Sequence, residues 1–393
     1  MSGLAAPVVG HNLPGASTTS APSRHIDAFD GIRGVAILWV ILHNATDESL
    51  LISTPAEHVL NALTHPGWIG VQLFFGLSGF LITAGLLEAQ GAPHYFRNFY
   101  AKRALRILPL YYAVLLAFLV VLPLVVPFRL PYSSDGQASM WLFTANWTHA
   151  TPYGFAHFWS LMVEEQFYLF WPLVVFRLSP QRLLPVCLWI AAGSLLLRTI
   201  LAAHGTYWFT LYSATSCRMD ALALGGAGAC VMRLPSVRRA LQDRLSGINF
   251  AVLVIFLAGI PLTHSYDRTR IVGQTLGYSL LALCCATFVT TTALADRRSH
   301  GVQALLRWRW VRSCGRYSYA MYVFHGLLHK FIGEPLLVGR FGERLPGWVV
   351  FVYALVLILA SYLAGFCSYH LLEKHFLRLK RYLEPAPTAA QSA

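Results

Sequence analysis

The chain has 393 residues, of which 56% are hydrophobic and 12% are charged, and its formal net charge is +13. A soluble domain carries roughly a quarter charged residues, so this composition excludes an ordinary soluble protein and indicates an integral membrane protein. A basic excess can also indicate a nucleic-acid partner. Here the basic residues fall mainly in short loops between apolar stretches, which predicts the lipid bilayer as partner and no nucleic acid.

No signal peptide is predicted at the N-terminus. Residues 1–26 are rich in Ala, Pro, Ser and Gly and contain no apolar core. A segment of this composition buries too little apolar surface to fold alone, so we predict a disordered cytoplasmic tail there. We expect one transmembrane domain over 27–376 and a cytoplasmic tail over 377–393.

Apolar stretches long enough to cross a bilayer recur along the chain. A hydrocarbon core of roughly 30 Å requires about 20 mostly apolar residues in each helix. We therefore predict an all-α, polytopic transmembrane helix bundle with about ten transmembrane helices. The predicted spans are 28–46, 67–88, 107–127, 158–177, 183–203, 213–233, 247–264, 273–294, 315–333 and 347–372.

The distribution of Lys and Arg predicts how this bundle is oriented. Cytoplasmic loops retain positive charge when a membrane protein is inserted. With the N-terminus inside, most of the Lys and Arg residues fall in predicted cytoplasmic segments. Both termini are therefore predicted to be cytoplasmic.

Ionisable residues occur inside the first predicted span, where polar groups are costly unless they are paired. Asp30 and Arg33 are three residues apart on one helix face, so we expect them to pair near the cytoplasmic interface. His43 lies roughly 15 Å further along the same helix, near its outer end. Taken alone, a histidine in this position is more often an interfacial residue than a catalytic one.

Two further groups carry the candidate chemistry. Glu164 and Glu165 lie in the first turns of the fourth span, at the same outer level as His43. Either one of them orients the His43 imidazole, or both face water. Arg103 and Arg106 are one turn apart at the inner end of the third span. Two guanidinium groups on one helix face suit a phosphate clamp, although positive charge on the cytoplasmic side also explains each of them.

Polar residues of the sixth span also require partners. Arg218 and Asp220 point apart on a helix, so each needs a partner from another helix. Trp159 belongs to an aromatic stretch before the fourth span, which suits either an interfacial belt or stacking on a sugar.

Five segments of the chain form a recognisable series. They are DGIRGVAILWVILH at 30–43, GVQLFFGLSGFLIT at 70–83, the RxxR at 103–106, SLMVEEQFYLFWP at 160–172 and GRYSYAMYVFH at 315–325. A sixth and less specific segment, CRMDALALGGAGA at 217–229, fits in order. With these segments the chain resembles the acyltransferase-3 family of bacterial integral-membrane acyltransferases, from about Asp27 to Phe376.

The resemblance implies an acyl-CoA-dependent O-acyltransferase of the bacterial inner (plasma) membrane. Such an enzyme would move an acyl group, most often acetyl, from acyl-CoA to a hydroxyl of a carbohydrate or glycosylated acceptor, with no metal. It further implies that His43 is catalytic and that Arg33, Arg103 and Arg106 bind the donor. Glu164 and Glu165 match an acidic pair, and His325 matches a recurring histidine whose role is open.

One departure and one alternative accompany this resemblance. Many family members read Glu-Lys-Pro near the C-terminus, whereas this chain has Glu373, Lys374 and His375. The alternative is a polytopic transporter or flippase of a glycan or lipid-linked substrate. Transporters often show paired helix breaks in two related halves, and this sequence shows no such symmetry.

Overall fold

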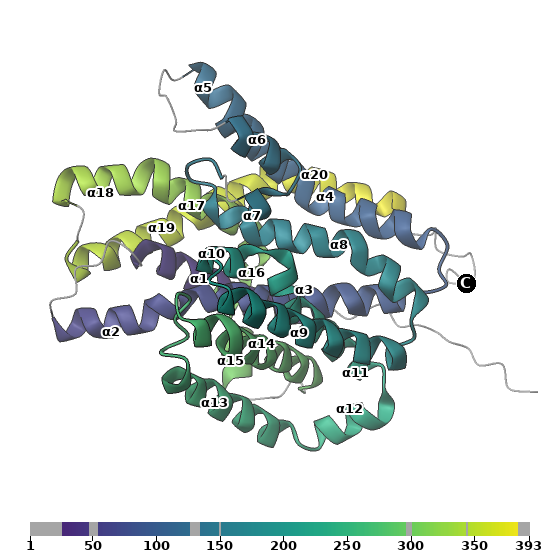
Figure 1. Cartoon of the computed structure of the whole chain (residues 1–393). Helices are drawn as coiled ribbons and strands as arrows, with labels where there is room; N and C mark the ends of the chain where they lie inside the picture. The colour runs from purple at the N-terminus through teal and green to yellow at the C-terminus, as the bar shows by residue number, and fades with distance from the viewer. Residues whose placement is uncertain are drawn as a thin grey trace, which may run out of the picture.

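The structure is a computed structural model that describes residues 26–46, 54–125, 134–148, 151–295, 301–342 and 345–383. These residues form an all-helical bundle without strands, which confirms the predicted fold class (Figure 1). Apart from Ile26, the predicted N-terminal tail lies outside the described residues. The predicted C-terminal tail is helical as far as Leu383, where the description ends.

Long helices form the body of the bundle, and shorter ones connect them. The long helices are α1 (Asp27–Thr46), α3 (Ile69–Glu88), α4 (Tyr95–Leu115), α8 (Trp159–Arg177), α9 (Pro180–Ala203), α11 (Thr215–Met232), α13 (Leu245–Leu262), α14 (Tyr278–Leu294), α17 (Ser318–Leu328) and α19 (Gly347–Ser368). The shorter α-helices are α2 (Pro55–Thr64), α5 (Leu122–Val125), α6 (Ser134–Trp141), α7 (Ala145–Thr148), α10 (Trp208–Ser213), α12 (Pro235–Gln242), α15 (Val302–Leu306), α16 (Arg309–Arg316), α18 (Glu334–Phe341) and α20 (Lys374–Arg378). Single 3₁₀ or π-helical turns are η1 (His65–Trp68), η2 (Leu116–Val121), η3 (Ala156–Phe158), η4 (Gly273–Gly277), η5 (His329–Gly333), η6 (Tyr369–Glu373) and η7 (Leu379–Leu383).

Each of the ten predicted spans is helical over most of its described residues, with internal breaks at Ala214 in the sixth span and at Tyr317 in the ninth. Six helical segments among the described residues are long and apolar enough to cross a membrane, and they contain α3, α4, α9, α13, α14 and α19. Polar and charged residues lower the apolarity of α1, α8 and α11, which carry the candidate site residues. The number of ten crossings and the cytoplasmic placement of both termini stay predictions.

The third predicted span begins earlier than the apolar pattern indicates. We expected it to start at residue 107, whereas α4 starts at Tyr95 and continues through η2 and α5 to Val125. Its first turns contain Arg97, Arg103 and Arg106. Because these residues are charged, this part of the helix does not form an apolar stretch and was not predicted as part of the span. Arg103 and Arg106 therefore lie within a continuous helix, which fixes their shared face.

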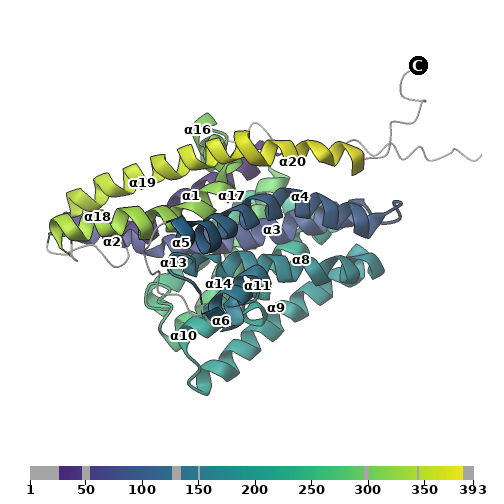
Figure 2. The same ribbon diagram turned by 90° about the horizontal axis from the view of Figure 1, so that it is seen from above.

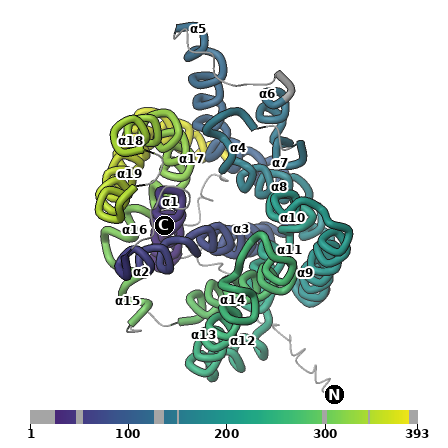
Figure 3. The backbone as a smooth tube through the Cα atoms, turned by 60° about the vertical axis from the view of Figure 1, so that its left-hand side comes forward, coloured from purple at the N-terminus to yellow at the C-terminus, as the bar shows by residue number. Residues whose placement is uncertain are grey.

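Helix α3 lies in the middle of the bundle. It packs against α1 on one side and against α8, α11 and α14 on the other, and α1 in turn packs against α16, α17 and α19. Figure 3 shows α3 between these two groups of helices. Figures 1 and 2 place α2 and α18 at one end of the bundle and α20 at the other, and we call these the α2 end and the α20 end.

Glycines allow α3 and α11 to approach until their backbones touch. A Cβ atom placed on Gly79 would lie 1.9 Å from the backbone oxygen of Leu222, and one on Gly225 would lie 2.1 Å from the backbone oxygen of Gly76. Small residues drive such close packing in membranes. The glycines of the second predicted span therefore serve helix packing, and this contact holds α11 against the centre of the bundle.

We expect Gly79→Ala to destabilise the bundle by about 1–3 kcal/mol, because the new methyl group must push α11 away. Gly85 on the same helix provides a matched control, since a Cβ there meets nothing within 4 Å. Gly85→Ala should leave stability unchanged or raise it slightly. Melting temperatures of the purified variants in detergent measure the difference, and equal values for the two variants would contradict the packing account.

Candidate active site

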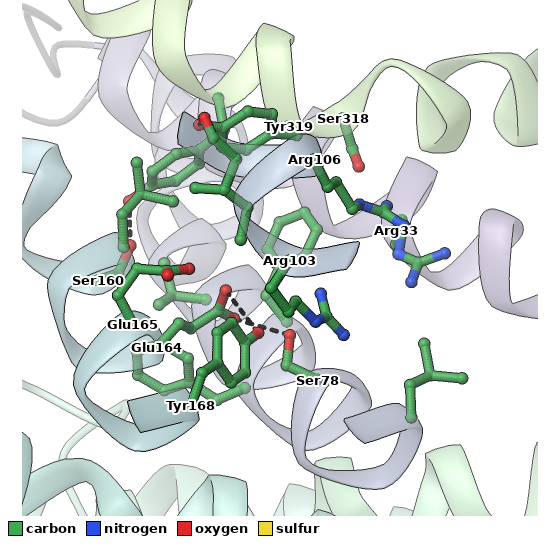
Figure 4. Close-up of a pocket in the computed structure, with 17 residues that line it drawn as sticks. Arg33, Ser78, Arg103, Arg106, Ser160, Glu164, Glu165, Tyr168, Ser318 and Tyr319 are labelled. Atoms are coloured by element: carbon green, nitrogen blue, oxygen red, sulfur yellow. Dashed lines mark hydrogen bonds between the residues drawn. The ribbon is translucent and has the colours of Figure 1, made fainter. Parts of the chain in front are cut away.

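A cavity of about 100 Å³ lies between α1, α3, α4, α8 and α17, and we call it the central cavity (Figure 4). Two larger cavities, of about 500 and 620 Å³, share Leu81, Arg103 and Arg106 with it. The larger two also reach Lys380 and Leu377, close to α20. Through these shared lining residues, the central cavity adjoins two cavities that extend toward the α20 end of the bundle.

Three arginines line the central cavity. Arg33 pairs with Asp30 at 3.2 Å, as their spacing predicts. The Arg103 guanidinium lies 4.8 Å from the ring centroid of Tyr168. In the part of the chain that the structure describes, neither Arg103 nor Arg106 donates a hydrogen bond or forms an ion pair. Their guanidinium groups are therefore available to an anionic ligand, and the one-turn spacing directs both into the same space.

The two adjacent glutamates line the same cavity. Glu164 accepts hydrogen bonds from the hydroxyl of Ser78 at 2.8 Å and from that of Tyr168 at 3.2 Å (Figure 4). Glu165 makes no hydrogen bond or ion pair with any described residue. Both carboxylates are half-buried. Both glutamates line the central cavity and therefore face the interior of the bundle.

His43 lies at a different place from this group of arginines and glutamates. It is buried near the end of α1, toward the α2 end of the bundle. A Cβ atom on Gly67 would lie 2.8 Å from its Cβ, and its ring centroid is 5.9 Å from that of His65. His43 is not among the residues that line the central cavity. Its predicted pairing with Glu164 or Glu165 stays a prediction.

Polar residues around His325 link the lining of the central cavity to Asn44, near the end of α1. The hydroxyls of Ser160 and Tyr322, which both line the cavity, are 2.7 Å apart, and Tyr322 donates to the backbone oxygen of His157 at 2.6 Å. His325 is fully buried, and its Nδ1 lies 2.6 Å from the Tyr322 carbonyl. Its Nε2 lies 3.4 Å from the amide nitrogen of Asn44, next to His43.

The buried Asp220 of α11 finds its partner on α9, as the sequence requires. Arg198 donates to its carboxylate at 2.7 Å and also to the backbone oxygen of Cys217. Ser279 of α14 contacts both side chains of this pair, at 2.5 Å from Arg198 and 3.4 Å from Asp220. Arg218 is not part of this network. Aromatic rings, including that of Trp159, surround its guanidinium.

Several residues of the site were not singled out from the sequence. Tyr168 had a signal, because it lies four residues after Glu164 and so shares its helix face. Ser78 lies in the mostly apolar segment 70–83, which gave no sign of a carboxylate partner. Partners on distant helices had no local signal, and this group comprises Arg198, Ser279, Tyr319 and Tyr322. No cluster of His, Cys, Asp and Glu suited to a metal ion occurs among the described residues.

We expect Asp220→Asn to cost about 3 kcal/mol or more, because it leaves the Arg198 charge buried without its counter-ion. The ion pair between Lys330 and Glu334, at 2.6 Å and one-third exposed, offers a control. Lys330→Gln should cost about 0.5 kcal/mol. Thermal unfolding in detergent compares the two, and a larger loss for Lys330→Gln would argue against the buried network.

Known proteins resemble the chain over most of its length. Residues 26–366 match a family model described as an acyltransferase domain. YrhL of Bacillus subtilis (strain 168), provisionally named a peptidoglycan O-acetyltransferase, is 28% identical over 89% of this chain and 55% of its own length. The peptidoglycan O-acetyltransferase OatA of Listeria monocytogenes (serovar 1/2a, strain EGD-e) is 26% identical over 78% of this chain and 50% of its own length. The O-acetyltransferase OatA of Staphylococcus aureus (strain NCTC 8325) is 23% identical over 89% of this chain and 57% of its own length.

These relatives are longer proteins. This chain spans about half the length of the curated relatives it matches. No solved structure matches it significantly.

Proposed function

The chain belongs to the acyltransferase-3 family, and from this premise we propose that it is a membrane O-acyltransferase. It transfers an acyl group, in particular acetyl, from acyl-CoA to a hydroxyl of a carbohydrate acceptor. The observation that carries the proposal is the central cavity, where two arginines that make no hydrogen bond or ion pair with a described residue lie with two carboxylates. The similarity to proteins named as peptidoglycan O-acetyltransferases supports a carbohydrate acceptor.

The donor binds through its phosphates at the α20 end. Guanidinium groups bind phosphate oxygens through paired hydrogen bonds, and Arg103 and Arg106 line all three connected cavities. Lys102 and Lys380 add positive charge to the cavity of about 500 Å³. The α20 end is the predicted cytoplasmic side, where acyl-CoA is present. In this arrangement the pantetheine arm extends from the arginines into the central cavity.

The acceptor approaches from the opposite side, because His43 lies toward the α2 end. His43 takes the proton of the acceptor hydroxyl as its oxygen attacks the thioester carbonyl. The new C–O bond forms, the C–S bond breaks, and the CoA thiolate leaves and receives the proton. A carboxylate stabilises the His43 imidazolium from the uptake of the proton until its transfer to the thiolate. Glu165 suits this role better than Glu164, which is already held by Ser78 and Tyr168.

The donor clamp is tested by Arg103→Gln combined with Arg106→Gln. We expect the KM for acetyl-CoA to rise about ten-fold or more, because two charge-assisted contacts to phosphate are lost. S-acetylpantetheine lacks the nucleotide phosphates, so its KM should hardly change. Arg97→Gln on the exposed face of the same helix is the matched control. An unchanged KM for acetyl-CoA in the double variant would place the phosphates elsewhere.

The base is tested by His43→Ala, with the amount of protein in the membrane matched to the parent. We expect transfer of acetyl groups to fall by about 10²–10⁴-fold, the usual contribution of a general base. His58→Ala on the exposed surface of α2 should retain activity. Release of free CoA and acetylation of the acceptor are both measured. Retained activity in His43→Ala would remove this residue from the mechanism.

A further inference from the structure

Arg218 is a buried cation for whose protons the described residues provide no acceptor. The side chain is fully buried, and its Nε, Nη1 and Nη2 atoms have no hydrogen-bond partner within the described ranges. Its charge is instead surrounded by aromatic rings, whose faces attract cations. The distances from its guanidinium carbon to the ring centroids are 4.6 Å for Tyr278, 5.3 Å for Tyr212, 5.8 Å for Phe75 and 5.8 Å for Trp159.

Two other buried polar groups, one on Tyr278 and one on the Gln72 that contacts it, also lack a partner among the described residues. The hydroxyl of Tyr278 is fully buried and makes no hydrogen bond to a described residue. Gln72 donates to the Tyr278 carbonyl at 3.4 Å, while its own Oε1 has no donor within the same part of the chain. Buried polar groups normally have partners, so a cluster of such orphans indicates a missing ligand or water. The donors of Arg218 and Tyr278 require acceptor oxygens, whereas Gln72 offers an acceptor.

The charge around this cluster favours an anion. Asp220 is the nearby carboxylate, but Arg198 donates to it at 2.7 Å and balances its charge. The charge of Arg218 therefore remains in excess. A second cation, Arg268, lies 5.5 Å from the centroid of the Tyr212 ring, which the Arg218 guanidinium also contacts. The aromatic walls suit the apolar face of a sugar ring, because binding pockets combine such walls with a few polar groups.

The position of the cluster connects it to the proposed chemistry. Arg218 and Gln72 each lie one turn inside their helices, α11 and α3, at the ends where these helices begin. Trp68, whose ring contacts the rings of Tyr212 and Tyr278 at 5.8 and 5.6 Å, follows directly after the Gly67 that packs on His43. The adjacent residues Gly67 and Trp68 thus link the surroundings of His43 to those of the cluster.

We propose that Arg218, Tyr278 and Gln72 form an acceptor-recognition site for a sugar that carries a carboxylate. The guanidinium and the phenol donate to the carboxylate, and the Gln72 carbonyl accepts from a hydroxyl or amide of the sugar. Because Arg218 is fully buried, part of the aromatic surround of its guanidinium must move to admit the ligand. This inference rests on the proposed function, since it specifies the acceptor of that reaction.

The test measures binding to the full chain in lipid nanodiscs. The probes are the disaccharide of N-acetylglucosamine and N-acetylmuramic acid with a free lactyl carboxylate, and its methyl ester, which lacks the charge. We expect the unsubstituted protein to bind the acid about ten-fold or more tightly than the ester. Arg218→Gln should abolish this preference and Tyr278→Phe should reduce it. Tyr112→Phe, which removes a phenol bonded to the Trp141 carbonyl, should preserve it.

Two outcomes overturn the inference. One is equal or undetectable binding of the two sugars by the unsubstituted protein. The other is an undiminished preference for the acid in Arg218→Gln or, if that variant does not fold, in Tyr278→Phe. Parallel assays of CoA release separate this result from the proposed function. Acetyl transfer without a carboxylate preference overturns only the acceptor site, whereas a carboxylate preference without acetyl transfer overturns only the acyltransferase proposal.

Discussion

A charged side chain in the hydrocarbon core of a membrane costs several kcal/mol unless another charge, a polar cavity or aromatic rings compensate it. The helices of this bundle are arranged so that their buried charges are compensated in these ways. Asp220 and Arg198 neutralise each other between α11 and α9. Arg103 and Arg106 open into connected cavities, and Arg218 lies among aromatic rings. The positions of the candidate site residues follow from these three arrangements.

The arrangement divides the bundle along its length. The arginine-lined cavities reach the α20 end, whereas His43 and the Arg218 cluster lie toward the α2 end. Helix α3 connects the two regions, because Ser78 contacts Glu164 in the central cavity and Gln72 belongs to the cluster. Under the proposed function, donor and acceptor therefore enter from opposite ends and meet within the membrane.

The sequence predicts features that depend on local spacing. Apolar stretches predict the long helices, and the spacing of Asp30 and Arg33 predicts their ion pair. Contacts between distant helices could not be predicted, because no local pattern identifies Arg198 as the partner of Asp220 or Ser78 as a donor to Glu164. The early start of α4 was missed for a related reason, since its first turns are charged and only the later ones are apolar.

The most direct measurement places donor and acceptor on opposite sides of a membrane that contains the protein. Sealed liposomes receive acetyl-CoA only on the side that exposes the α20 end and a carbohydrate acceptor only on the other side. The proposed function predicts free CoA thiol on the donor side and an equal amount of acetylated acceptor on the other. Movement of unmodified carbohydrate across the membrane without release of thiol would contradict it and would indicate a transporter instead.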